Sequence, residues 1–496
     1  MNLKKKTFEL PFIGYDYGKD NKWNFDVLIG QFGNPIIGIK IKNNVEQYSA
    51  DPDAYLNFHT ILNQVVAIIG ENHIVQKIDI FSRKKYTAEN SNEFLQQKYS
   101  EHFNGRMFKT IDTILLFTDI VDQNTKKNKY AFSEKEYKKL RDKCLKTFML
   151  LTQNECEPEF LREKDFEHYI SGILSMNFSE IPSFDNVKAT HEHLNIGNKL
   201  VKTISFVDVE KIELPSEIET YSYLGGNGSA SETAVDNFSF INELEDYDTI
   251  VYNQIISIPH QSSKQRELEK KKKKHEGVAN NSPSNAIVAE EIDELLHNIA
   301  MDGQLIVDAH FSISYSTGSL EKMEETQSLI ENKLFMKGII VSQNSYNQLE
   351  LFRCCLPGNA VELKSYDLFT TTSEAALCFF FKESYPVNED SNFYLRFTDR
   401  QGVPLKIDPS DLPMKTGRIN NRNKFVLGPS GSGKSFLMNN IVEQYLTYNY
   451  DVIIVDTGDS YSGLCAYKGG RYIQYSEEKP ITMNPFLMDK EEFNIE

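Results

Sequence analysis

The residues with the clearest chemical meaning lie in the segment NKFVLGPSGSGKSF, residues 423–436. Its pattern G-x-x-x-x-G-K-[ST] is filled by Gly428, Pro429, Ser430, Gly431, Ser432, Gly433, Lys434 and Ser435. Glycines let backbone N–H groups point inward, where they bind phosphate oxygens together with the N-terminus of a following helix. Lysine adds a positive charge at the β- and γ-phosphates, and the hydroxyl of Ser435 is a ligand for Mg²⁺. The segment therefore predicts an ATP and Mg²⁺ site in which Lys434 and Ser435 are the catalytic residues and Phe436 borders the nucleotide.

Two elements must position this loop. The residues FVL (425–427) predict a short buried strand before it, and SFLMNNIVEQYLTYN (435–449) predicts a helix after it. The order strand, glycine loop, helix is the context in which this motif binds phosphate. Helical periodicity places six apolar side chains on one face of that helix: Phe436, Leu437, Ile441, Val442, Tyr445 and Leu446.

A second buried strand is predicted at DVIIVD (451–456), and it ends at Asp456. One interpretation makes Asp456 the acid that supports the metal ion. The other makes this a structural strand of a doubly wound sheet whose end borders the nucleotide site. We favour the second interpretation because TGDSY follows Asp456, without a further carboxylate directly after it.

Hydrolysis of ATP needs a metal-supporting acid, a group that orients water and, in most such enzymes, an arginine finger. No later apolar strand ends in Asp-Glu, and the sequence stops 61 residues after Ser435. We therefore expect a sequence truncated inside its motor domain, before the Walker B strand, and whether this chain is itself an enzyme stays open.

The whole chain predicts an α+β N-terminal region followed by the first part of an α/β P-loop domain, which resemblance to a known family makes RecA-like. Apolar runs around Gly33 predict a hairpin, and Asp51-Pro52 predicts the start of a helix that runs to Gly70. The expected domains are 1–195, a second α+β module at 196–395, and the truncated P-loop domain at 396–496.

Composition limits the function further. With 40% hydrophobic and 12% aromatic residues the chain is globular rather than disordered. A formal net charge of −17 argues against a chain-wide electrostatic grip on nucleic acid. The exception is the basic run KQRELEKKKKKHEG within 264–285, expected to be an exposed loop. It either contacts DNA or lipid phosphates or is simply solvated.

Six cysteines without metal-binding spacing are expected to be buried free thiols. No apolar run reaches the roughly 18 to 20 residues of a membrane span, and the first residues lack the apolar core of a signal peptide. We expect a cytoplasmic protein that docks peripherally on a membrane complex.

The ordered motifs GPSGSGKSF (428–436), D-x-G-x-S (456–460), GG-x-Y (469–472) and NPF (484–486) resemble the conjugation ATPases of type IV secretion systems. The similarity is greatest to the TraG-type ATPases of conjugative transposons. LPGN (356–359), TTTSEAALCFFF (370–381) and VQKIDIFSRKKY (75–86) also resemble segments of that family.

The resemblance implies a HerA–FtsK-like P-loop motor that works as a cytoplasmic hexamer at the base of a secretion channel. It implies ATP-driven channel assembly or transfer of DNA or protein, with channel proteins as partners and a DNA contact. The family's Walker B acids and arginine finger have no matching positions here. An assembly or docking module with an incomplete nucleotide site is therefore the alternative. A small-molecule P-loop kinase is disfavoured, because such kinases usually begin with the loop strand.

Overall fold

The protein divides into two compact units, which are described separately. Unit 1 comprises Met1–Tyr86, Gly105–Pro386 and Arg400–Val403, and unit 2 comprises Thr87–Asn104, Val387–Asp399 and Pro404–Glu496. The computed structural model describes residues 9–16, 25–46, 52–88, 90, 94–121, 134–178, 186–206, 220–224, 230–234, 236–279, 283–341, 347–386, 388–391, 393–398 and 404–477.

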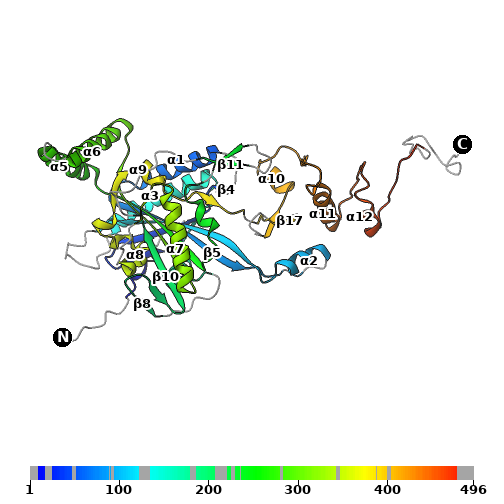
Figure 1. Ribbon diagram of the computed structural model, residues 1–496, viewed down its shortest axis with the longest axis horizontal. Coiled ribbons are helices and arrows are strands. Elements are labelled where there is room, and N and C mark those ends of the chain that lie inside the picture. Colours follow the sequence, from blue (N-terminus) through cyan, green and yellow to red (C-terminus); the bar gives the residue numbers. More distant parts are fainter. Residues whose placement is uncertain are drawn as a thin grey trace. The chain divides into compact units, whose positions relative to one another are not determined.

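Unit 1 is built on a twelve-stranded sheet whose neighbouring strands all run antiparallel (Figure 1). The path is β1-β2-β3-β6-β5-β13-β14-β10-β9-β8, and β15 and β7 pair with β14 and β3. The strands are β1 (Phe12–Asp16), β2 (Val27–Gly30), β3 (Pro35–Ile41), β5 (His73–Lys85), β6 (Met107–Asp119), β7 (Glu159–Phe160), β8 (Val187–Ala189), β9 (Leu194–Ile196), β10 (Lys199–Ser205), β13 (Thr249–Ile258), β14 (Ile306–Thr317) and β15 (Phe369–Thr372).

Three smaller sheets complete the strand inventory of the described residues. The pair β4 (Val45–Glu46) and β16 (Glu383–Ser384) is parallel, and the pair β11 (Thr220–Leu224) and β12 (Ala230–Ala234) is antiparallel. The third, β17 (Leu395–Thr398) with β18 (Pro404–Ile407), is antiparallel and belongs to unit 2.

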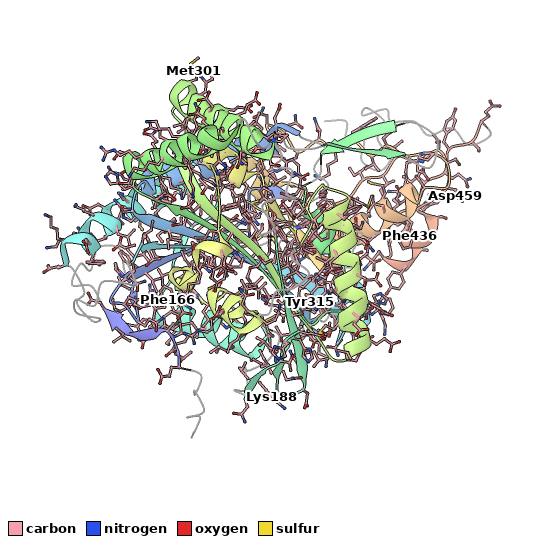
Figure 2. The ribbon with its side chains drawn as sticks, turned by 60° about the vertical axis from the view of Figure 1, so that its left-hand side comes forward. Phe166, Lys188, Met301, Tyr315, Phe436 and Asp459 are labelled. Atoms are coloured by element: carbon pink, nitrogen blue, oxygen red, sulfur yellow. The ribbon has the colours of Figure 1, made fainter. Side chains whose placement is uncertain are left out.

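Helices cover both faces of the large sheet. One hydrophobic cluster joins α1 (Pro52–Ile69), α3 (Glu134–Gln153), α7 (Leu320–Phe335) and α9 (Ser373–Leu377) to one sheet face. A second cluster joins α4 (Glu163–Ser175) and α8 (Gln348–Cys354) to the other face. Figure 2 labels Tyr315 from the first cluster and Phe166 from the second. Alternate residues of each strand point to opposite faces, which is why both clusters draw on the same strands.

Several local predictions are confirmed. The hairpin at Gly33 joins β2 to β3, with Gly33 in the left-handed region at φ 80°. Helix α1 begins at Pro52, and Gly70 follows its end at φ 63°. All six cysteines are free thiols, of which five are buried and Cys465 is partly exposed.

The basic run is helical, so the prediction of an exposed loop is wrong for its described residues. Helix α5 (Gln261–Ala279) packs against α6 (Pro283–Asp302) to form a hairpin between β13 and β14. Lys, Glu, Gln and Arg are good helix formers, and Leu268 anchors the helix against Ile292 and Ile299 of α6. Local propensity and this contact together favour helix over loop.

A buried ion pair lies at the middle of β5. Lys77 and Asp79 are both inaccessible to solvent, and Lys77 Nζ lies 2.5 Å from Asp79 Oδ2. Both side chains point to the α1 side of the sheet, where two apolar residues would be expected. Burial lowers the pKa of Lys77, and the nearby Asp79 charge opposes that shift. The carboxylate of Asp79 also accepts hydrogen bonds from Asn43, Thr113 and Gln254 at 2.6–3.0 Å.

Three more buried charged residues lie next to this pair: Asp236, Lys382 and Glu383. Glu383 Oε1 accepts hydrogen bonds from the Tyr55 hydroxyl at 2.8 Å and from the Asp236 N–H at 3.0 Å. Burial, helped by the Asp236 charge, raises the pKa of Glu383 to about 7. Every one of these charges is thus held by specific partners, as burial requires.

Strands from both sides of residue 195 share the large sheet. In the order β6-β5-β13-β14-β10, the first two strands precede residue 195 and the other three follow it. The three-domain division at 195 and 395 stays a prediction.

A search for membrane-spanning helices among the described residues finds none of sufficient length and apolar character.

We predict that Lys77→Met lowers the free energy of unfolding of the protein by about 3–5 kcal/mol, because Asp79 would keep a buried charge without its cation. Urea unfolding followed by circular dichroism measures this. The matched control is Lys84→Met on the same strand. Lys84 is half-exposed and lies 3.5 Å from Asp112, so its loss should cost less than about 1 kcal/mol. Equal costs for the two variants would contradict the assignment.

Candidate nucleotide site

The predicted helix after the glycine loop is present as α11 (Lys434–Thr447), and its apolar face builds the core of unit 2. Leu437, Ile441 and Tyr445 follow one another at four-residue spacing and pack with Phe393 and Leu395. The rings of Phe393 and Tyr445 stack with centroids 5.2 Å apart. This packing fixes α11 against the β17–β18 hairpin.

Phe436 does not belong to that apolar face, contrary to the periodicity argument. Its side chain is 82% exposed, whereas Leu437 packs inward. Successive residues of a helix lie about 100° apart, so Phe436 lies about 140° from the centre of the face formed by Leu437, Ile441 and Tyr445. Figure 2 shows Phe436 and Asp459 on the C-terminal part of the chain. The role of Phe436 beside a nucleotide stays a prediction.

The glycine loop has the backbone expected of a phosphate cradle. Gly431 and Gly433 have φ values of 78° and 87°, in the region that side chains disfavour. Gly433 is also the N-cap of α11, so the free N–H groups of the first helical turn face the loop. At Gly428 an added Cβ would lie 2.5 Å from the Ser432 hydroxyl oxygen. The backbone angles at Gly431 and Gly433 therefore favour glycine, and a side chain at residue 428 would need the Ser432 hydroxyl to move.

Lys434 folds back over this loop. Its Nζ donates hydrogen bonds to the carbonyls of Gly428 and Pro429, both at 2.8 Å. The ammonium group is therefore held at the loop, where it can meet phosphate oxygens, and Ser435 follows it in the first helical turn. Loop, helix N-terminus and ammonium group form a set that fits a phosphate anion.

The D-x-G-x-S motif is a turn closed by its own aspartate. Asp456 Oδ2 accepts a hydrogen bond from the Ser460 N–H at 2.7 Å. The N–H groups of Ser460, Gly458 and Thr457 lower the pKa of the Asp456 carboxyl. These contacts explain the spacing of the motif. Its assignment to the nucleotide site stays a prediction.

Asn439 connects the phosphate loop to this turn, and the sequence analysis did not identify it. Its Nδ2 donates hydrogen bonds to the carbonyl of Ser435 at 2.8 Å and to that of Ser460 at 3.1 Å. Asn439 follows Ser435 by four residues, so it lies on the same helix face. That spacing was the only signal in the sequence. The bond positions the Asp456 turn beside the helix that carries the loop.

The two predicted buried strands are not observed. Residues 424–427 and 451–456 form no ladder with any described strand, and their apolar side chains are exposed. Phe425 is 88% exposed, Ile453 93% and Val455 96%. Their sequence favours strand, but a strand needs a neighbour that accepts and donates its hydrogen bonds. In the described part of unit 2, neither β17 nor β18 pairs with these segments. The parallel strand order of a RecA-like sheet is not observed there.

Unit 2 includes α2 (Phe94–Phe103), which lies far from the glycine loop in sequence. The Tyr99 hydroxyl donates a hydrogen bond of 2.7 Å to the carbonyl of Phe397 in β17. A hollow of about 340 Å³ lies between α2 and α11, lined among others by Tyr99, Phe436 and Asn440. No sequence motif signals this association.

Among the described residues no group of three or more His, Cys, Asp or Glu side chains is arranged to hold a metal ion. That is compatible with Mg²⁺ chemistry of the P-loop kind, where the ion is held mainly by phosphates, water and one hydroxyl. Ser435 is the residue that would supply the hydroxyl, and a bound Mg²⁺ would neutralise phosphate charge.

A glycine loop of this geometry at the start of a helix defines a P-loop phosphate-binding protein. Residues 394–496 match the family model described as the TraG P-loop domain. The chain therefore carries a TraG-type P-loop domain, and the match confirms the resemblance to TraG-type conjugative ATPases that its motifs indicate. No curated protein matches the chain. The NPF motif at 484–486 lies outside the described residues.

We predict that Lys434→Ala weakens ATP binding at least tenfold, because the loop loses its only side-chain cation at the phosphates. Equilibrium binding of a fluorescent ATP analogue measures the affinity. Lys415→Ala is the control, since Lys415 is exposed and lies in the same unit. Unchanged circular dichroism should show that both variants are folded. Equal affinities of Lys434→Ala and the unaltered chain would refute the site.

Proposed function

We propose that this protein is the ATP-binding motor component of a conjugative, type IV secretion-like transfer apparatus. The observation that carries the proposal is the TraG P-loop match over residues 394–496, supported by a glycine loop whose backbone and lysine fit a phosphate. In this role ATP energises channel assembly or the transfer of DNA or protein. Channel proteins are the partners, and the protein works at the cytoplasmic face of the membrane through them.

Each residue of the loop has a stated part in this proposal. The N–H groups of residues 430–435 bind the β- and γ-phosphates, and Lys434 neutralises their charge. Ser435 places its hydroxyl toward Mg²⁺. Asn439 keeps the Asp456 turn beside the loop through its two hydrogen bonds, so that a change at the phosphates is passed to residues 456–460.

The working form is proposed to be a RecA-like ring of six copies. Support comes from the exposed apolar segments 425–427 and 452–455. Their sequence favours strand, and burial of Phe425, Ile453 and Val455 would stabilise them by roughly 1.5–3 kcal/mol each. A sheet that covers these segments would bring the Asp456 turn and the glycine loop to one edge, as in other open α/β nucleotide sites.

The second candidate function is an assembly or docking module. The unpaired state of residues 424–427 and 451–456 favours it, because the strands that should support the nucleotide site do not form among the described residues. In this role unit 1, with its extended sheet and two buried cores, is the part that channel proteins recognise. Nucleotide would then serve to order unit 2 rather than to drive transport.

DNA transfer separates the two candidates. In donor cells whose only copy of the protein is Lys434→Ala, the motor role predicts loss of transfer by several orders of magnitude, because ATP use is abolished. Transfer frequency into recipient cells is the measurement, with Lys415→Ala as the control and immunoblots to show equal amounts. Wild-type transfer by Lys434→Ala would exclude the motor and favour the docking module.

For the purified 496-residue chain we predict ATP binding with steady-state hydrolysis near background. Asp456 is the acid at the end of the predicted strand that follows the loop helix, and its carboxylate is engaged by the N–H groups of its own turn. Phosphate release at saturating ATP and Mg²⁺ measures turnover. Turnover that Lys434→Ala abolishes would contradict this prediction and assign a complete active site to the chain.

A further inference from the structure

In the helical hairpin α5–α6, one side of α5 packs on α6 and the opposite side carries exposed positive charges. It extends from the end of the large sheet of unit 1, at the left edge of Figure 1. Nineteen residues make α5 roughly 28 Å long. One side of α5 packs on α6 through Leu268, and on that same side Lys272 Nζ lies 2.5 Å from Asp293 Oδ1. The His275 Nδ1 and the Asn285 Oδ1 are 2.7 Å apart.

The opposite side of α5 is a basic stripe of four exposed residues. Arg266, Lys270 and Lys273 follow at spacings of four and three, so they lie on one helix face roughly 140–200° from Leu268, and Lys274 adjoins them. Among the described residues, the ion pairs of α5 lysines involve only Lys264 and Lys272. The stripe therefore keeps its full positive charge for an external partner.

Acidic residues lie on the flanks of the stripe. Glu267 and Glu269 lie roughly 100° to either side of Leu268, and Glu276 lies near Glu269. The outer surface of α6 adds exposed Glu290, Glu291 and Glu294. Exposed Lys271 lies on the Glu267 side, so the stripe is bounded by acids on the Glu269 side and by mixed charge on the other. A flat anionic surface that meets only the central stripe avoids contact with the acids.

The same arrangement does not fit a DNA groove. A helix in the major groove has phosphates along both of its sides. Here those phosphates would meet Glu269 with Glu276 on one flank, and Glu267 together with Lys271 on the other. The stripe also has a single arginine and no exposed Asn or Gln that could read base edges. The charge pattern thus favours a plane over a groove.

We propose that the outer face of α5 binds the acidic phospholipid headgroups of a membrane, with Arg266, Lys270, Lys273 and Lys274 as the contacting residues. The net charge of −17 repels such a surface, but charges are screened beyond about 8–10 Å in physiological salt. A hairpin roughly 28 Å long places most of its stripe outside that range. The proposal rests on α5 alone and is independent of the proposed motor function.

Flotation of the full 496-residue protein with lipid vesicles tests this. We expect binding to vesicles of phosphatidylcholine with about 30% phosphatidylglycerol and none to vesicles of pure phosphatidylcholine. Each cation near an anionic surface strengthens partitioning about fivefold. The variant Lys270→Gln, Lys273→Gln, Lys274→Gln should therefore lower the partition coefficient about 100-fold.

The matched control removes three exposed lysines from another helix of unit 1: Lys135→Gln, Lys139→Gln, Lys146→Gln on α3. It changes the net charge equally and should bind vesicles as the unaltered protein does. Equal losses in both triple variants, or no binding of the unaltered protein to acidic vesicles, would overturn the proposal. So would α5-dependent binding to duplex DNA together with α5-independent binding to vesicles. Lys434→Ala should bind vesicles normally, which separates this result from the motor function.

Discussion

The constraint on which unit 1 depends is the buried segment 377–385, which is irregular between the end of α9 and β16. Backbone groups that lie in a core without regular structure must find partners among side chains. Here the sheet supplies them. Lys77 Nζ donates to the Phe381 carbonyl at 2.8 Å, and Gln254 Oε1 accepts from the Phe381 N–H at the same distance. The remaining bonds run from Tyr252 to Phe379, from the Lys382 side chain to Leu377 and Phe380, and from Asn43 to Glu383. Polar residues on the inner face of β5 and β13 are thus explained by the segment that they hold.

In the candidate site the glycine loop and its helix are formed, but the two predicted strands that should support them are unpaired among the described residues. The cradle at 428–435 needs only a few backbone angles, one helix and a lysine, and all of these form within about ten residues. The supporting strands depend on neighbours. Where no described strand lies beside them, Ile453 and Val455 remain exposed although their sequence favours burial. The match to the TraG P-loop domain includes the local part, and the proposed mechanism depends on the tertiary support.

Much of this could be predicted from sequence wherever a short pattern determines the outcome. The Gly33 hairpin, helix α1 and the phosphate loop each follow from turn residues, caps or glycine spacing. The charged residues at 77 and 79 gave no such signal, because their partners come from other segments of the chain, from Asn43 before them to Phe381 about 300 residues later. The association of α2 with β17 was equally hidden, since Tyr99 and Phe397 are brought together only by the fold. The prediction of a buried strand at 451–456 is wrong for a physical reason. An apolar run indicates a preference for strand, but it does not show whether a neighbouring strand is present to pair with it.

Unit 2 is assembled from three separate stretches of chain, and this has a consequence for how the protein is made. The α2 stretch leaves the ribosome almost 300 residues before β17 does, and it must wait, attached to β5 and β6, for its partners to be synthesised. Unit 1 can form its long ladders during that time, but unit 2 cannot close before the C-terminal part is complete. Any attempt to excise the P-loop region as a continuous fragment from residue 387 onward would leave α2 behind and expose the surface that Tyr99 covers.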